Sequence, residues 1–122
     1  MRQKRYLVAI PIPALDRRGR RLKAGRIREW VRLAGEELTA CFGGATPILA
    51  PGTNVVGGKV LYERGQVLVV SGCDNRSDFL DKKDRIAIFA ERMGEELDQE
   101  SVFVLAFDSD SLLIEIPKAT GR

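Results

Sequence analysis

Histidine is absent from this chain of 122 residues. Its imidazole is the usual general base of Ser-His-Asp and Cys-His catalytic sites and a frequent metal ligand. The composition therefore excludes those catalytic and metal sites as they are ordinarily built. Any chemistry has to rest on carboxylates, amides, hydroxyls, thiols, lysine, tyrosine or the backbone.

Cysteines and long apolar runs are also scarce. Cys41 and Cys73 are the only cysteines, and their spacing predicts neither a zinc site nor a thioredoxin-type motif. We expect two buried thiols; a single disulfide is the alternative, although no secretory segment supports it. No stretch is long enough to cross a bilayer, and the apolar run near the start is broken by Pro11 and Pro13. These features predict a soluble, cytoplasmic protein with one domain over residues 1–122.

Hydrophobic periodicity predicts two helices. In the first, apolar residues recur at helical spacing on one face, and Gly43-Gly44 ends the helix. The second spans roughly residues 78–97, with Ser77 or Asp78 as its N-cap. The expected buried faces consist of Ile27, Trp30, Val31, Ala34, Leu38 and Cys41 in the first helix, and Ile86, Phe89, Ala90, Met93 and Leu97 in the second.

The other apolar segments predict strands. An irregular loop rich in glycine and proline is expected over residues 51–58. The two segments around Gly65 form either two strands or one strand with a bulge. The polar Asp108-Ser109-Asp110 run predicts a hairpin turn. Strands are expected at residues 5–12, 45–50, 59–63, 66–72, 101–107 and 112–116.

This order of elements predicts an α+β fold. It matches the ferredoxin-like βαββαβ sandwich, an antiparallel sheet with two helices on one face, with an extra C-terminal strand. The other face of the sheet also carries apolar residues, and small domains of this kind often bury such a face by oligomerising. We therefore expect a homo-oligomer.

A basic stretch precedes and enters the first helix, with seven Lys or Arg between residues 17 and 28 and no interleaved aromatic residue. One interpretation is contact with phosphate or nucleic acid; the other is a solvated loop. Positive charge near a helix N-terminus is unfavourable, so a bound anion or an acidic neighbouring subunit would account for it. The anion-binding candidates are Arg17, Arg18, Arg20 and Arg21.

The glycine-rich segments FGGATP and APGTNVVGG predict turns. No Gly-Lys-Ser/Thr follows either segment, and neither opens a helix after a strand, so Walker A and dinucleotide-binding motifs are absent. Because loops carry function more often than cores do, Thr53 and Asn54 are the polar candidates for ligand binding here.

Glu63 and Gln99 each stand where a strand begins or ends. Glu63 lies where a strand meets its turn, and Gln99 lies where the second helix meets the next strand. If these strands share one sheet, both residues lie near its rim. There Glu63 offers a carboxylate to a cation and Gln99 an amide to a polar group. The simpler interpretation is that Glu63 is solvated and Gln99 caps a helix end.

The sequence YERGQVLVV, followed later by RIAIFAERMGEELDQESVFVLAF, resembles a pattern in a bacterial domain family of unknown function. In that pattern a Glu precedes an apolar strand, and a Gln-Glu-Ser-Val segment opens a later one. The same skeleton is similar, more distantly, to the phage-encoded S-adenosylmethionine lyases. The resemblance covers about residues 43–114.

The resemblance to the lyases implies a phage-related, ferredoxin-like homotrimer with active sites between subunits. Such enzymes split S-adenosylmethionine into methylthioadenosine and homoserine lactone. The resemblance implies Glu63 and Gln99 as the catalytic residues. Since the substrate's own carboxylate displaces a neutral thioether, no cofactor or metal is expected. Outside the motif, we assign Tyr62 to adenine packing or to the substrate cation.

Three hypotheses follow. The first is an oligomer that binds, and as an enzyme cleaves, S-adenosylmethionine or a similar cationic metabolite. The second is a non-catalytic ligand-binding or assembly module that uses the same cleft between subunits. The third is an anion or nucleic-acid binder that works through residues 17–28.

Overall fold

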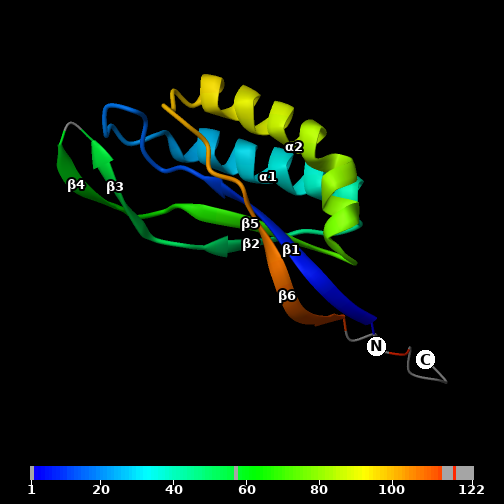
Figure 1. Ribbon diagram of the computed structural model, residues 1–122. Helices are drawn as coiled ribbons and strands as arrows, with labels where there is room; N and C mark the ends of the chain where they lie inside the picture. Colours follow the sequence, from blue (N-terminus) through cyan, green and yellow to red (C-terminus); the bar gives the residue numbers. More distant parts are fainter. Residues whose placement is uncertain (1, 57, 114–116, 118–122) are drawn as a thin grey trace.

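The computed structural model describes residues 2–56, 58–113 and 117, and for residues 2, 52–56, 60–63 and 110–113 it describes the backbone alone. Within that part the chain forms two helices and six strands (Figure 1). In order these are β1 (Arg2–Ile12), α1 (Ala24–Phe42), β2 (Thr46–Leu49), β3 (Gly52–Val56), β4 (Lys59–Glu63), β5 (Val67–Cys73), α2 (Arg76–Glu96) and β6 (Leu105–Leu113).

Four strands form the main sheet, in the order β2-β5-β1-β6, with every neighbouring pair antiparallel. β3 and β4 pair only with each other, as a hairpin between β2 and β5. Without that hairpin, the chain runs β1-α1-β2-β5-α2-β6. This is the βαββαβ order of a ferredoxin-like sandwich, so the predicted fold is confirmed.

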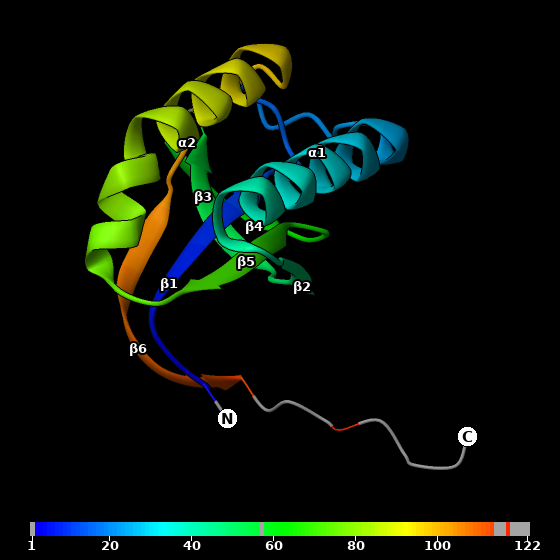
Figure 2. The ribbon, with the colours of Figure 1, turned by 90° about the vertical axis from the view of Figure 1, so that its right-hand side faces the viewer.

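Both helices lie on one face of the sheet (Figure 2). Alternate residues of β1 point at them, namely Tyr6, Val8, Ile10 and Ile12, and all four are buried. Val69 and Cys73 of β5 share that face, because they pair with Ile10 and Tyr6. The core therefore lies in a single layer between helices and sheet.

The predicted faces of both helices are confirmed. Trp30, Ala34 and Leu38 of α1 are buried, and the five apolar residues predicted for the second helical face are all buried as well. α1 ends as expected, with Gly43 in the left-handed conformation at φ 93°.

The predicted N-cap of α2 is wrong. Asn75 fills that position, and its side chain accepts a hydrogen bond of 3.0 Å from the backbone N–H of Asp78. Asp78 instead lies in the first turn, where its negative charge is favourable.

In the middle of the chain the structure corrects one prediction and decides between two alternatives that the sequence left open. Residues 52–56, expected as an irregular loop, form β3, which pairs with β4 through a turn where Gly58 adopts φ 78°. The segments around Gly65 are two strands rather than one bulged strand, because β4 pairs with β3 whereas β5 pairs with β1 and β2.

The C-terminal hairpin is also corrected. β6 begins at Leu105, so residues 101–104 are not part of it, and it runs unbroken through the polar run that predicted a turn. Asp108 pairs with Tyr6 and Ser111 with Lys4, so two residues of β6 oppose one of β1. The polar run therefore forms a β-bulge. Residues 112 and 113 belong to β6, and residues 114–116 of the expected extra strand lie outside the described residues.

In the described part of the chain, neither helix is sufficiently long and apolar to span a membrane.

Candidate functional site

The junction between α2 and β6 ends the helix with a defined motif. The backbone N–H of Gln99 donates to Gly94 O at 2.9 Å, and that of Asp98 donates to Glu95 O at 3.3 Å. This is the hydrogen-bond pattern of a Schellman motif, whose left-handed position is usually glycine. Here Asp98 occupies it, at φ 52°. An aspartate in that conformation is strained, so surrounding contacts must hold it.

Two arginines of the basic stretch supply those contacts. Arg17 forms a 2.9 Å ion pair with the Asp98 carboxylate, its backbone N–H donates to Asp98 O, and its guanidinium donates to Gln99 O at 2.8 Å. Arg26 donates to Glu96 O at 3.1 Å and lies 3.5 Å from the Glu96 carboxylate. Arg26 thus satisfies one of the carbonyls that α2 leaves without a partner at its C-terminus, and Arg17 binds two carbonyls just beyond the helix. Both cations also suit the helix dipole.

The side chain of Gln99 completes the junction. Its Nε2 donates to Leu15 O at 2.7 Å and to Leu97 O at 2.9 Å. Carbonyl oxygens only accept, so the amide nitrogen must face them, and Oε1 is left as an acceptor for another group. The amide nitrogen of Gln99 therefore has the predicted role of capping the helix end. The oxygen keeps its capacity for a ligand.

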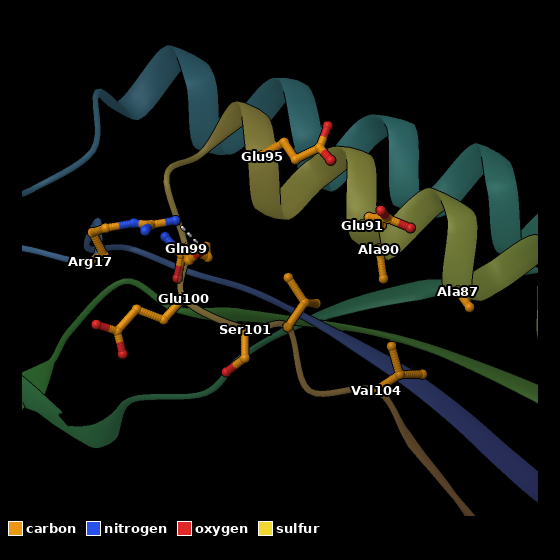
Figure 3. A pocket seen from close by; sticks show the side chains of 10 residues that line it. Arg17, Ala87, Ala90, Glu91, Glu95, Gln99, Glu100, Ser101 and Val104 are labelled. Carbon is orange, nitrogen blue, oxygen red and sulfur yellow. Dashed lines mark hydrogen bonds between the residues drawn. The ribbon is translucent and has the colours of Figure 1, made fainter.

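A pocket of about 430 Å³ opens beside this junction, between α2 and the segment that leads into β6 (Figure 3). Ala87 and Ala90 point from α2 toward that segment, and Val104 lies opposite them. Val102 of the same segment also lines the pocket. The volume falls within the range of about 300–1,000 Å³ that small-molecule sites occupy. The polar lining residues are Arg17, Glu91, Glu95, Gln99, Glu100 and Ser101.

The pocket combines apolar walls with an acidic rim. Among the residues that the structure describes, Glu91, Glu95 and Glu100 have no ion-pair partner, while the Arg17 guanidinium is already paired with Asp98. Carboxylates and an amide oxygen are acceptors only, so this lining favours a ligand that carries a positive charge or N–H donors. The arrangement can bind and orient a cationic ligand.

The structure brings Gln99 into this pocket, and it places Glu63 at the same end of the molecule. Glu63 ends β4 opposite Gly52. Two residues later Gly65 packs on the loop after β1, close to Arg21 and Ala14, and the same loop contacts Gln99 through Leu15 O. Figure 1 shows the β3–β4 hairpin and the segment before β6 at this end.

The other residues predicted for ligand binding lie on the β3–β4 hairpin. Thr53 pairs with Tyr62, and Asn54 pairs with Leu61 across the two strands. The side chains of Thr53, Asn54, Tyr62 and Glu63 lie outside the described residues. Their part in the site stays a prediction.

Sequence reasoning did not identify the three carboxylates on the rim. Glu91 and Glu95 are four residues apart, as are Ala87 and Glu91, which is a signal for one helix face that carries small and acidic residues together. Glu100 follows Gln99 directly in the sequence. Only the position of α2 beside the segment that leads into β6 shows that these residues line one pocket.

The two cysteines are not part of the pocket lining and are free thiols; Cys73 is buried as predicted, and Cys41 is only partly buried. Burial, with a contribution from nearby Asp78, raises the pKa of the Cys73 thiol to about 11, and burial also raises the pKa of Cys41. Both thiols therefore stay protonated near neutral pH, which disfavours a nucleophilic role. Within the described part of the chain, no group of three or more acidic or cysteine side chains is placed to hold a metal ion.

Comparison with known proteins shows likeness in fold alone. No protein-family model matches the chain, and no curated protein matches it at a significant level.

Among solved structures, a phage SAM lyase in complex with S-methyl-5'-thioadenosine is 15% identical with a TM-score of 0.60, over 88% of this chain and 83% of that one. The phage SAM lyase in the apo state is 16% identical with a TM-score of 0.58, over 84% and 79%. A CutA1 variant from Pyrococcus horikoshii OT3 is 13% identical with a TM-score of 0.51, over 88% and 86%. The chain thus shares the fold of phage SAM lyase and CutA1 structures.

Proposed function

We propose that the protein binds S-adenosylmethionine and cleaves it to methylthioadenosine and homoserine lactone. The observation that carries the proposal is the pocket at the α2–β6 junction, where Gln99 belongs to the lining together with an acidic rim. S-adenosylmethionine carries a sulfonium and an ammonium, the charges that such a rim attracts. A phage SAM lyase with the same fold was solved with S-methyl-5'-thioadenosine.

The reaction suits a site without histidine. The carboxylate oxygen of the substrate attacks its own γ-carbon, the carbon–sulfur bond breaks, and the electron pair moves to sulfur. The leaving group is a neutral thioether, so no proton transfer is needed. The protein has to hold the amino-acid chain in its reactive conformer and exclude water.

In this proposal each predicted residue has one role. The Glu63 carboxylate holds the substrate ammonium, and Gln99 Oε1 orients it. Tyr62 packs against the adenine or the sulfonium. Thr53 and Asn54 supply polar contacts from the hairpin. The site lies between subunits, so the hairpin that meets a given Gln99 pocket belongs to a neighbouring copy.

The proposed oligomer forms through the sheet face that the helices leave uncovered (Figure 2). Residues alternate along a strand, so the strand register places a second set of apolar residues on this face. Phe107 and Ile48 are 46% and 49% exposed there. An apolar surface of this kind typically marks an interface. The set is Leu7, Ala9, Pro11, Ile48, Leu68, Val70, Leu105 and Phe107.

The test is to incubate the purified protein with S-adenosylmethionine and to follow products by chromatography and mass spectrometry. We expect methylthioadenosine together with homoserine lactone or homoserine, above the spontaneous rate. Glu63→Gln and Gln99→Ala should each lower that rate on the order of 100-fold, because positioning is lost.

A matched control separates catalysis from folding. Gln99→Ala also removes the hydrogen bond to Leu15 O, and Asp16→Asn loosens the same loop without touching the pocket. The control should keep its activity. Unchanged turnover in both site variants would refute the assignment of the residues. Binding of S-adenosylmethionine without product would favour the non-catalytic ligand-binding module.

A further inference from the structure

The basic stretch divides into two groups in the structure. Three of its cations are ion-paired inside the chain: Arg17 with Asp98, Arg20 with Asp16, and Arg26 with Glu96. Among the residues that the structure describes, the other four have no side-chain hydrogen bond or ion pair, and all four are exposed. These four are Arg18, Arg21, Lys23 and Arg28, and we call them the unpaired basic surface.

A hydrogen-bonded loop carries Arg18 and Arg21, while Lys23 and Arg28 belong to the N-cap and the body of α1. The Asp16 carboxylate accepts hydrogen bonds from the backbone N–H groups of Arg18 and Arg20, both at 2.9 Å, and from the Arg20 guanidinium at 3.0 Å. Gly19 N–H donates back to Asp16 O at 2.9 Å, and Leu22 N–H donates to Ala14 O at 2.9 Å. The loop is therefore closed on itself, so the exposed cations stand on a frame that is formed before any ligand binds.

The fold does not neutralise these charges. Lys23 occupies the N-cap of α1 without a side-chain cap, and no acidic residue lies in the first turn. The Arg28 guanidinium even folds back toward the start of the helix, 3.9 Å from where a Cβ on Gly25 would lie. Cations gathered near the positive end of a helix are mutually unfavourable, and an external anion would relieve this.

The paired cations form hydrogen bonds and ion pairs within the fold, and the unpaired ones form none among the described residues. Arg17 and Arg26 satisfy carbonyls at the end of α2, and Arg20 closes the loop. Removal of the four unpaired side chains would break no side-chain hydrogen bond or ion pair among the residues that the structure describes. Their exposure on one loop and the first two turns of one helix suits a ligand with several separated negative charges. A nucleic-acid backbone has such charges at regular intervals.

The chemistry of the stretch favours duplex over single-stranded nucleic acid. Single strands are held by aromatic side chains that stack on their bases, and no aromatic residue occurs between Pro13 and Glu29. We propose that Arg18, Arg21, Lys23 and Arg28 form a surface that binds the phosphate backbone of double-stranded nucleic acid. This surface acts through charge alone and is independent of the lyase proposal.

The test measures the anisotropy of a fluorescent mixed-sequence DNA duplex of about 20 base pairs over a series of salt concentrations. The logarithm of affinity should fall with the logarithm of salt with a slope of about −0.9 per neutralised phosphate, hence about −3.6 for four contacts. Arg18→Gln/Arg21→Gln and Lys23→Gln/Arg28→Gln should each reduce the slope by about 1.8, since each removes two contacts.

The matched control is Lys83→Gln/Arg92→Gln, which removes two exposed cations from α2. It should keep the slope of the unchanged protein, and all variants should keep its melting temperature. An equal reduction of the salt slope in the control would show that the net charge of the whole protein, and not this surface, drives binding. That result would overturn the proposal. Three other results would also overturn the proposal. They are a lack of duplex binding at about 50 mM salt, a preference for a single strand of the same sequence, and binding to anionic phosphatidylserine vesicles in place of the duplex.

Discussion

Gln99 and Gly94 show how single residues set the α2–β6 junction. The two carbonyls that bind Gln99 Nε2 leave only its oxygen for a ligand. The sequence pointed to this residue and left a ligand role and a cap role open. The structure shows the cap contacts of the amide nitrogen, and the ligand role of the chemically different oxygen end stays a prediction. Gly94 accepts the last hydrogen bond of the motif and is buried against Val102.

A prediction at this scale compares two glycines within helices. A Cβ on Gly94 would lie 2.8 Å from Val102 Cγ2, whereas one on Gly35 would meet nothing within 4 Å. Gly35→Ala should stabilise the protein by up to about 1 kcal/mol, the difference in helix propensity. Gly94→Ala should destabilise it by about 1–3 kcal/mol, because the stiff valine cannot yield easily. Denaturant unfolding measures both.

The Val102→Ala background tests the cause. In that background the methyl group added by Gly94→Ala no longer contacts the valine side chain. The loss of unfolding free energy caused by Gly94→Ala should therefore largely disappear in the double variant. Equal stability of Gly94→Ala and Gly35→Ala in the unchanged background would contradict the proposed clash.

At the scale of elements, the loop between β1 and α1 links three parts of the fold. Asp16 closes it, Leu15 and Arg17 contact the end of α2, and Arg21 lies against the β4–β5 turn. The sequence indicated a basic loop here. It did not indicate that an acidic residue organises the loop, because the partners of Asp16 are backbone groups whose directions depend on the folded turn.

The pH dependence of this loop is predictable in sign. Partial burial raises the pKa of the Asp16 carboxyl, but hydrogen bonds from the backbone of Arg20 and Arg18 and from the Arg20 guanidinium outweigh it, so the pKa lies below its usual value. The ionised form is therefore favoured in the folded state. Its contribution to stability is complete above the unfolded pKa of about 3.9 and is lost as the pH falls through the lower folded pKa.

Asp16→Asn should thus destabilise the protein near neutral pH, and the difference from the unchanged protein should shrink below about pH 4. Denaturant unfolding at several pH values gives the comparison. Asp84→Asn, at an exposed position of α2, is the control and should show no such trend. A difference that stays constant down to about pH 2 would mean that the Asp16 charge does not stabilise the loop.

At the scale of the whole molecule, both helices cover one face of the sheet (Figure 2). The other face carries exposed apolar side chains, among them Ile48 and Phe107. Phe107→Asp should dissociate the proposed oligomer, because burying an unpaired carboxylate in an apolar interface is strongly unfavourable. Sedimentation equilibrium of the unchanged protein should give a multiple of the chain mass, and the variant should give the chain mass.

Ile88→Asp is the control for the oligomer. Ile88 lies on α2, is 61% exposed, and is away from the sheet face, so its replacement should leave the mass unchanged. A monomeric unchanged protein, or dissociation by Ile88→Asp alone, would contradict an interface through the sheet.

The sequence by itself determined the helices, their buried faces and the ferredoxin-like order, because local periodicity and glycine stops specify them. It also placed Gln99 at the end of the second helix, because that junction is local. The tertiary structure alone decided that residues 52–56 pair as β3, that the polar run in β6 is a bulge, and which cations are paired. Arg17, for example, binds the carbonyl of a residue 82 positions later. Such contacts join residues that are far apart in the sequence, so they depend on how the chain packs around its core. No local sequence pattern encodes them.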